Sequence, residues 1–294
     1  MKHWKPAAIA ALWSGALYAA PMPVVASFSI LGDVAQQIGG ERVAVQNLVG
    51  ANQDAHAYNL TSGDIKKIRE ARLVLLNGLG LEKAELQRAV KQSKVASAEA
   101  TAGIKPLAAD EHHHEHNHGH DHDHGEFDPH VWNDPVLMQR YAANVAIALI
   151  KADPAGSRYY QQRFKDYQNV LNQLNNYANQ QFGAVAPAKR KVLTGHDSFA
   201  YLGKRYQVKF ISPQGVSSEA EPSARQIAAI IRQIKAENVK AVFTENIKDG
   251  RMIARIAKET GVKVSGGLYA DALSSSAPAG TYADIFRYNV RVMS

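Results

Sequence analysis

Cysteine is absent from the 294 residues of this sequence. No disulfide framework can therefore support the fold, and no thiolate can bind a metal ion. The same absence leaves no cysteine to carry an N-terminal lipid, so we expect no lipid anchor. Apolar residues still make up 46% of the chain, which is enough to bury the cores of two ordinary domains or one large one.

Clustered positive charge is also lacking. The formal net charge is +7, but the basic residues are scattered and form no arginine-rich stripe beside aromatic side chains. A nucleic-acid partner is therefore not expected. Between Pro106 and Gln139 there is no lysine or arginine at all, whereas acidic residues and histidines are abundant. This segment can attract cations.

Long hydrophobic runs are nearly absent, and the exception is near the N-terminus. Lys2 and Lys5 precede the apolar run PAAIAALWSGALYAA, residues 6–20. A basic start and an apolar run of this length are typical of a secretory signal peptide, which we place at 1–22. The run is too short for a comfortable transmembrane helix, and a buried N-terminal helix is the alternative. We find no second membrane segment and expect an exported protein that is not inserted in a membrane. A bacterial periplasm fits such a protein.

Strands and helices alternate after the signal segment. Apolar runs predict strands at 24–28, 43–49, 72–78, 190–194, 207–212, 240–244 and 262–267. Helical spacing follows most of them, notably at 82–93, 198–206, 222–237, 250–260 and 281–292. This alternation predicts right-handed βαβ units and parallel sheets. The expected fold class is α/β, with two Rossmann-like lobes at 23–133 and 187–294.

Helices in 134–186 are expected to join the two lobes. One helix follows Asp134-Pro135, and another is opened by Asp153-Pro154, with the aspartate as cap and the proline in the first turn. The apolar side chains of the second helix recur every three or four residues: Tyr160, Phe164, Tyr167, Leu171, Leu174, Ala178 and Phe182. At 1.5 Å per residue this helix would reach roughly 40 Å, more than one lobe needs. We therefore expect a long backbone helix between the lobes.

Most of the histidines lie in one acidic tract, 111–124. The eight histidines of the tract are His112, His113, His114, His116, His118, His120, His122 and His124. Their irregular spacing cannot hold one fixed geometry, but it can offer many weak, exchanging metal sites. The alternative is a solvated spacer whose histidines have little role. The surrounding segment, 103–129, is of low complexity and is not expected to contribute to a core.

Outside the tract and the signal segment, only three histidines remain, His56, His130 and His196. Each falls in a predicted strand-to-helix connection, where a parallel sheet places its ligand loops. A fourth connection, GGLYADALS, adds Asp271. Three imidazoles and a carboxylate can close a tetrahedral site around Zn²⁺. Because a lone loop histidine is usually just solvated, the prediction depends on the whole set.

Several segments resemble bacterial ABC-transporter solute-binding proteins that capture zinc or manganese, most of all the zinc branch. The segments are VVASFSILGDVAQQIGG, DAHAYNLT, FDPHVWNDP, TGHDSFAYLGKRY and GGLYADALS, and FDPHVWNDP is the most specific. The resemblance covers nearly the whole chain after the signal segment. It implies a metal-type periplasmic binding protein with His56, His130, His196 and Asp271 as ligands between the lobes. It also implies delivery of the metal to a membrane permease driven by a cytoplasmic ATPase.

The chain departs from the family pattern in ways that bear on the metal. The first motif usually reads Asp-Pro-His-x-Tyr-Glu, whereas Ala55 and Asn59 replace the proline and the glutamate here. At the third ligand position manganese-type relatives tend to carry glutamate, and this chain carries His196. Imidazole suits Zn²⁺ better than the harder Mn²⁺, so we predict zinc. The tract looks like the mobile His-rich loop of zinc-specific relatives, and it can also be a docking site for a periplasmic zinc metallochaperone.

Four further residues are candidates for supporting roles. Glu245 follows a predicted strand and can fix the tautomer of a ligand imidazole. Asp128 can orient the loop of His130 by accepting hydrogen bonds from backbone N–H groups. Trp132 and Tyr58 can shield the site from water. Solvated acids and ordinary packing are the alternatives for these residues.

The expected function is that of a monomeric zinc-binding protein. Binding needs neutral imidazoles, so the affinity should fall as the pH drops through about 6. One rival is a zinc-dependent hydrolase, which would need an open coordination position and a base such as Glu245. With Asp271 as fourth ligand no position stays open, and we expect no enzyme. The other rival is a metal-binding adhesin, against which the missing lipid anchor argues.

Overall fold

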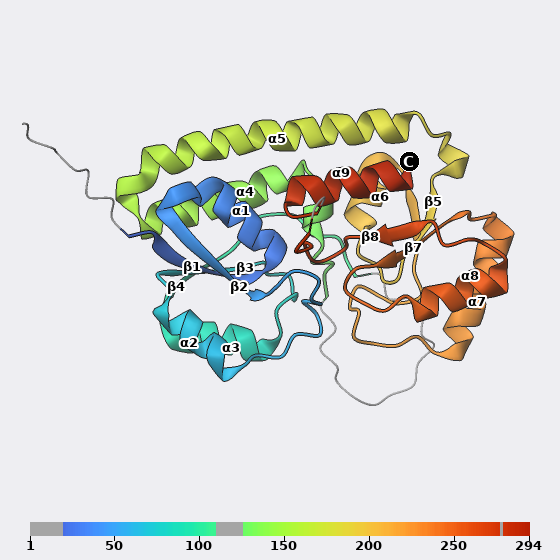
Figure 1. The fold of residues 1–294 in the computed structure, drawn as a ribbon, viewed down its shortest axis with the longest axis horizontal. Coiled ribbons are helices and arrows are strands. Elements are labelled where there is room, and N and C mark those ends of the chain that lie inside the picture. The colour runs from blue at the N-terminus through green and yellow to red at the C-terminus, as the bar shows by residue number, and fades with distance from the viewer. Residues whose placement is uncertain (1–19, 110–125, 277–278) are drawn as a thin grey trace, which may run out of the picture.

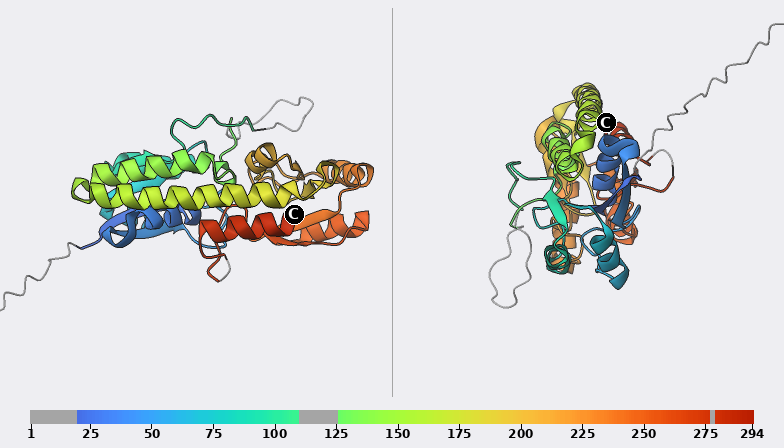
Figure 2. Two further views of the ribbon diagram at one scale, coloured as in Figure 1. Left: turned by 90° about the horizontal axis from the view of Figure 1, so that it is seen from above. Right: turned by 90° about the vertical axis from the view of Figure 1, so that its left-hand side faces the viewer.

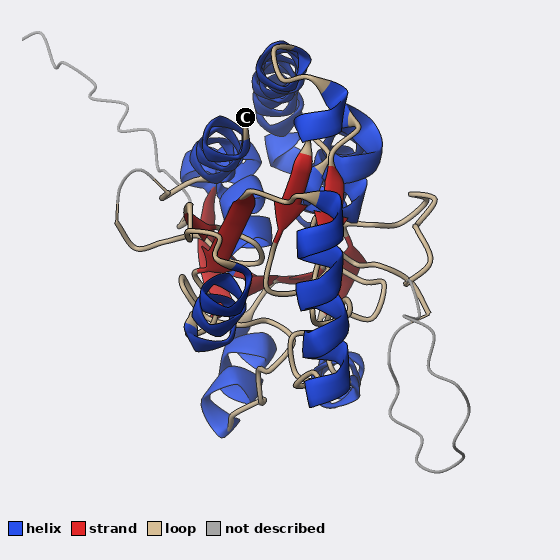
Figure 3. Ribbon diagram, turned by 90° about the vertical axis from the view of Figure 1, so that its right-hand side faces the viewer, coloured by secondary structure: helices blue, strands red, loops and turns tan. Residues whose placement is uncertain are grey.

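The computed structural model describes residues 20–109, 126–276 and 279–294. Almost all of the predicted signal peptide, 1–22, lies outside the described residues, as does the whole histidine tract. The described chain forms two separate four-stranded sheets flanked by helices (Figure 1, Figure 3). This architecture confirms the predicted α/β class. Among the described helices we find none with the length and apolar character needed to span a bilayer.

The first sheet has the strand order β2-β1-β3-β4, and all its neighbouring strands are parallel. Its strands are β1 (Met22–Phe28), β2 (Val43–Val49), β3 (Leu73–Leu76) and β4 (Ala96–Glu99). The helices that follow them are α1 (Ser29–Gly39), α2 (Ser62–Glu70), α3 (Ala84–Ser93) and α4 (Leu137–Ala152). The central strands β1 and β3 are buried on both faces, as their continuous apolar runs require.

The second sheet repeats this arrangement with the order β6-β5-β7-β8, again parallel. Its strands are β5 (Lys191–Leu193), β6 (Lys209–Ile211), β7 (Ala241–Glu245) and β8 (Gly266–Leu268). Its helices are α6 (Ala200–Tyr206), α7 (Ala224–Glu237), α8 (Arg251–Thr260) and α9 (Tyr282–Met293). Short 3-10 turns occur at Gly40–Arg42, Val131–Asn133, Pro154–Gly156 and Pro187–Lys189.

Helix α5 (Ser157–Gly183) runs alongside both sheets (Figure 1, Figure 2). The predicted apolar face is buried except at Phe164, which is partly buried. The helix packs on α1 and α4 of the first half and on α6 and α9 of the second half. A single hydrophobic cluster therefore extends through both halves of the molecule. This shared core holds the two sheets in a defined relation to each other.

Most predicted strands are found with bounds shifted by one or two residues, and two strands differ more from the sequence prediction. β4 was not expected, because its sequence ASAE has no apolar run; it is an edge strand with mostly exposed side chains. The last strand starts at Gly266 rather than at 262, because only three residues of β8 pair with β7.

Some helix starts and the low-complexity segment also need correction. The carboxylate of Asp153 does not cap the following helix, because it accepts hydrogen bonds from Arg42 and Tyr160 instead. The turn Pro154–Gly156 is of the 3-10 type, and α5 begins after it. The expectation that 103–129 adds nothing to a core is wrong at one end, since Ile104 is buried in the main cluster.

Candidate metal site

Four potential ligands come from four strand-to-helix connections. His56 lies between β2 and α2, and His130 lies between β4 and α4. His196 lies between β5 and α6, and Asp271 lies between β8 and α9. The strands of each sheet are parallel, so their carboxyl ends share one edge, and ligand loops gather there. One ligand atom of each residue lies within 4.8 Å of the other three.

The distances between these atoms fit a tetrahedral ion. His56 Nε2 lies 3.1 Å from His130 Nε2. Asp271 Oδ2 lies 3.0 Å from His196 Nε2 and 3.4 Å from His56 Nε2. Asp271 Oδ1 lies 3.5 Å from His130 Nε2. Four donors at roughly 2.0–2.2 Å from a zinc ion would lie about 3.3–3.6 Å apart at the corners of a tetrahedron. The site is therefore close to the size that Zn²⁺ needs.

The four side chains are shielded from solvent. His56 is 6% exposed, and the other three are 0% exposed. Nε2 of His196 and both carboxylate oxygens of Asp271 are buried without a hydrogen-bond partner among the described residues. Buried polar atoms normally have partners, and an unpaired buried charge is costly. A divalent cation between these atoms would satisfy all of them, so the donor set fits such an ion.

Two further carboxylates hold the far sides of two imidazoles. Asp128 Oδ1 lies 2.7 Å from Nδ1 of His130, and Glu245 Oε2 lies 2.6 Å from Nδ1 of His196. A carboxylate can only accept here, so it places a proton on Nδ1 and leaves the Nε2 lone pair directed at the site. Glu245 Oε1 also accepts the N–H groups of Gly195 and His196. One acid therefore fixes both the ring and the backbone of this loop.

Burial and charge act in opposite directions on the histidines of the first half. Burial disfavours the charged imidazole, and it prevails at His56, whose pKa is lowered. Burial also acts to lower the pKa of His130. There the carboxylates of Asp271 and Asp128 outweigh it and raise the pKa to about 9. His130 therefore tends to hold a proton that a metal ion would have to displace.

The second half shows the same competition. Burial acts to lower the pKa of His196, but Glu245 and Asp271 outweigh it and raise the pKa well above its ordinary value. Burial acts to raise the pKa of Asp271, but His196 and His130 hold that pKa well below its usual range. The carboxylate of Asp271 is thus stabilised as an anion among imidazoles.

Aromatic side chains differ in their relation to the site. The ring centroids of Trp132 and His130 lie 5.1 Å apart. The indole N–H of Trp132 donates to the carbonyl oxygen of Ala270 at 2.9 Å. Trp132 therefore contacts ligand loops of both halves. The hydroxyl of Tyr58 instead donates to Asp64 at the start of α2.

Sequence reasoning did not identify two buried polar residues: Asn77, which contacts the His130 loop, and Glu82, which accepts a hydrogen bond from the backbone of Asn77. Both lie in NGLGLE, directly after β3, and both are buried. Asn77 donates a hydrogen bond to the carbonyl oxygen of Pro129, the residue before His130. The available signal was its position at the carboxyl end of a buried strand, the same edge that carries the ligand loops.

Comparison with known proteins identifies the family of this chain. The family described as "Zinc-uptake complex component A periplasmic" (ZnuA) matches residues 24–294. The manganese-binding lipoprotein MntA of Bacillus subtilis (strain 168) is 31% identical over 283 residues, which cover 93% of this chain and 89% of MntA. The manganese ABC transporter substrate-binding lipoprotein PsaA of Streptococcus anginosus is 26% identical over 270 residues, which cover 92% of this chain and 87% of PsaA.

A solved structure extends the similarity to the whole fold. The periplasmic zinc-binding protein TroA from Treponema pallidum has a TM-score of 0.83 and 25% sequence identity to this chain. The match covers 93% of this chain and 98% of TroA. The names of these relatives describe binding proteins, two of them metal-binding lipoproteins, and not enzymes. This chain belongs to the ZnuA family of metal-binding periplasmic proteins of ABC transporters.

Proposed function

We propose that this protein binds one divalent metal ion through Nε2 of His56, His130 and His196 and a carboxylate oxygen of Asp271. The observation that supports this proposal is the convergence of four buried donors from both halves within 4.8 Å of one another. Because both halves contribute ligands, binding of the ion stabilises one relation between them. A transport partner can then distinguish the loaded protein from the empty one.

We further propose that the ion is Zn²⁺. Three imidazoles and one carboxylate form a donor set that tetrahedral zinc accepts, whereas Mn²⁺ prefers oxygen donors. His196 supports this assignment, because it supplies nitrogen at the position where manganese-type relatives tend to carry glutamate. Manganese is the second candidate, since MntA and PsaA are named for that metal. With Asp271 as a ligand, a tetrahedral ion keeps no open position for a reactive water.

The proposed site of action is the periplasm, where the protein delivers its ion to a permease driven by a cytoplasmic ATPase. Membership in a family of periplasmic uptake components supports a location outside the cytoplasm and a transporter partner. In this role the protein acts as a monomer, and a periplasmic zinc metallochaperone is a further candidate partner.

The histidine tract is proposed to add weak zinc sites close to the buried one. Its flanking residues are described and are joined to each other: Asp128 N–H donates to the carbonyl oxygen of Leu107 at 2.9 Å, and Ala109 N–H donates to that of Glu126 at 3.2 Å. Asp128 is also the partner of His130. The described residues on either side of the tract therefore lie beside a ligand loop, and we propose that an ion bound by the tract is passed to the buried site.

Competition titration of the exported protein against a chromophoric chelator tests this function. We expect one tight zinc equivalent, further weak equivalents, and at least tenfold weaker binding of Mn²⁺. Deleting 111–124 should remove the weak equivalents and preserve the tight one. A matched variant in which the eight tract histidines are changed to asparagine keeps the length of the chain. It should lose the weak equivalents and keep the tight one, as the deletion does. If the wild type binds no zinc ion tightly, the proposed function is refuted. If deletion of 111–124 removes the tight zinc site, that site belongs to the tract and not to the four buried donors.

Zinc binding is expected to release protons near pH 7.5. The pKa of His130 is raised to about 9, yet the ion coordinates the unprotonated ring. Below a pH of about 9, each proton that zinc displaces weakens the apparent affinity by up to about tenfold per pH unit, so the affinity rises with pH until both His130 and His196, whose pKa is also raised, are neutral. The loss therefore sets in well above the pH of about 6 expected for a free imidazole, because carboxylates surround the ring. Calorimetric titration in two buffers of different ionisation enthalpy measures the release; identical heats would contradict it.

A further inference from the structure

Asn77 connects several segments of the first half. It follows β3, is 0% exposed, and has a partner for every polar group. Its backbone N–H donates to Glu82 Oε1 at 2.6 Å, and its carbonyl oxygen accepts from Thr101 Oγ1 at 2.6 Å. Its side-chain Oδ1 accepts from the Tyr141 hydroxyl at 3.0 Å, and Nδ2 donates to the carbonyl oxygen of Gly78 at 3.0 Å and to that of Pro129 at 3.2 Å. Only the last bond reaches a ligand loop.

The bond to Pro129 acts on the peptide unit that precedes His130. The carbonyl oxygen of that unit is held by Asn77, and its N–H donates to Asp128 Oδ1 at 2.9 Å. The same carbonyl oxygen also accepts from the Val131 N–H at 2.9 Å, so both polar ends of the peptide have partners within the loop, and Asn77 adds the bond that reaches the end of β3. Since Asp128 also holds Nδ1 of His130, the position of Nε2 follows from these contacts. Asp128 is itself part of the loop, whereas Asn77 directly follows β3.

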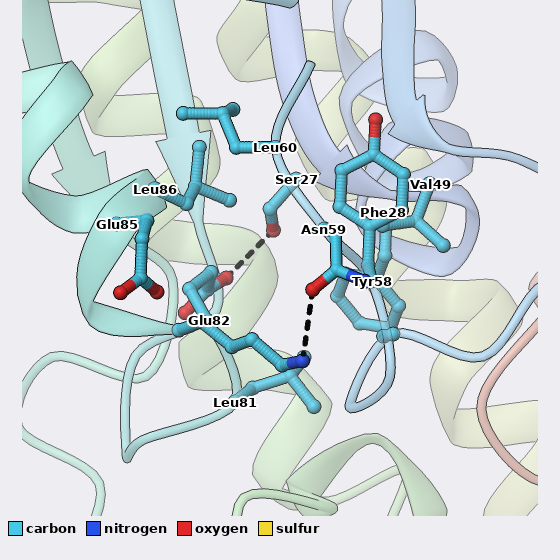
Figure 4. Close-up of a pocket in the computed structure, with 12 residues that line it drawn as sticks. Ser27, Phe28, Val49, Tyr58, Asn59, Leu60, Leu81, Glu82, Glu85 and Leu86 are labelled. Atoms are coloured by element: carbon cyan, nitrogen blue, oxygen red, sulfur yellow. Dashed lines mark hydrogen bonds between the residues drawn. The ribbon is translucent and has the colours of Figure 1, made fainter.

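The amide of Asn77 has only one orientation that satisfies its neighbours. The Tyr141 hydroxyl donates to Oδ1, which directs the two N–H groups of Nδ2 away from Tyr141, toward the carbonyl oxygens of Gly78 and Pro129. The backbone of Asn77 is held in turn by Glu82, whose Oε1 also accepts from Ser27 Oγ at 2.7 Å (Figure 4). Ser27 lies in β1, so the carboxylate of Glu82 ties the loop after β3 to the centre of the sheet.

We infer that Asn77 is a positioning residue for the metal site, which fixes the His130 loop to the first sheet before the ion arrives. This inference rests on the proposed function. Asn77 is not one of the four proposed ligands, and none of its hydrogen bonds given above goes to a ligand side chain. Its effect is to reduce the reorganisation that His130 would otherwise undergo when the ion binds, as partners behind metal ligands do elsewhere.

The substitution Asn77→Ala removes the bond to Pro129 and tests the inference. We expect the zinc Kd to rise by about 10- to 100-fold, the range typical of partners behind metal ligands. Thr101→Val is the matched control, because Thr101 is buried in the same network but does not contact the loop. Both variants should lower the melting temperature by a few degrees. The control should keep the zinc Kd within about threefold of wild type, well below the loss expected from Asn77→Ala.

A double-mutant cycle shows whether the effect passes through His130. In a His130→Ala background, adding Asn77→Ala should change the zinc Kd by less than about twofold. An undiminished loss in that background would overturn the inference, as would a wild-type Kd for Asn77→Ala. If Asn77→Ala does not fold, Tyr141→Phe releases the orientation of the amide instead and should raise the Kd at least about threefold; no change would overturn the inference. If the wild-type protein has no tight zinc site, the proposed function is refuted, and the inference about Asn77 falls with it.

Discussion

Replacing His196 by alanine should weaken zinc binding by about a hundredfold or more. Binding of zinc to a four-ligand site has an apparent free energy of roughly 10–16 kcal/mol, so one ligand contributes on the order of 3 kcal/mol. The loss also leaves the carboxylate of Glu245 buried without its ring partner at 2.6 Å. The measurement is a chelator competition titration of the folded variant. Unchanged affinity would remove His196 from the site.

A matched variant at the same position separates ligand number from ligand type. His196→Glu keeps a donor but replaces nitrogen by oxygen, and Glu245→Gln must accompany it because two carboxylates would otherwise face each other at close range. We expect the ratio of zinc affinity to manganese affinity to fall by at least about tenfold relative to wild type. An unchanged ratio would show that His196 does not determine the choice of metal.

Changing Asp271 to asparagine should weaken zinc binding by about a hundredfold or more while the protein remains folded. The amide has nearly the same shape, but it lacks the negative charge and directs N–H donors at the ion. Asp271 is 0% exposed, so no water can replace its oxygens. In the metal-free protein the change also removes a carboxylate that raises the pKa of His130 and His196. Fewer protons should then be released on zinc binding, which offsets only a small part of the loss.

Asp249→Asn provides the control for charge alone. Asp249 lies in the same half but is exposed and paired with Arg251. The control should bind zinc as the wild type does, because an exposed ion pair contributes little and Asp249 is not one of the four buried donors. If Asp271→Asn bound zinc as tightly as this control, a carboxylate ligand at position 271 would be excluded.

The sequence predicts the regular elements well where side chains are buried. The continuous apolar run LVLL predicts β3, and apolar residues at every third or fourth position predict α5. Both patterns are clear because these side chains pack in a core. β4 escapes such reasoning, since its edge position leaves its side chains exposed and without a pattern. The chain order of strands and helices was therefore predictable, whereas the outer edge of the first sheet was not.

The candidate site is predictable in its members and not in its contacts. His56, His130 and His196 stand out because the described chain has no other histidines, and each follows a strand. The pairing of His196 with Glu245 joins residues 49 positions apart and depends on how β5 lies beside β7. Asn77 falls inside the strand predicted at 72–78, whereas β3 ends at Leu76. Only the fold shows that its amide reaches Pro129.

The most direct test of the proposed metal site is a crystal structure of the dialysed protein. The crystals are grown with zinc, and the diffraction is measured at the zinc absorption edge. We expect one strong anomalous peak between the two sheets. It should lie roughly 2.0–2.2 Å from Nε2 of His56, His130 and His196 and from one oxygen of Asp271. A strong peak elsewhere, with these four side chains turned away from one another, would contradict it.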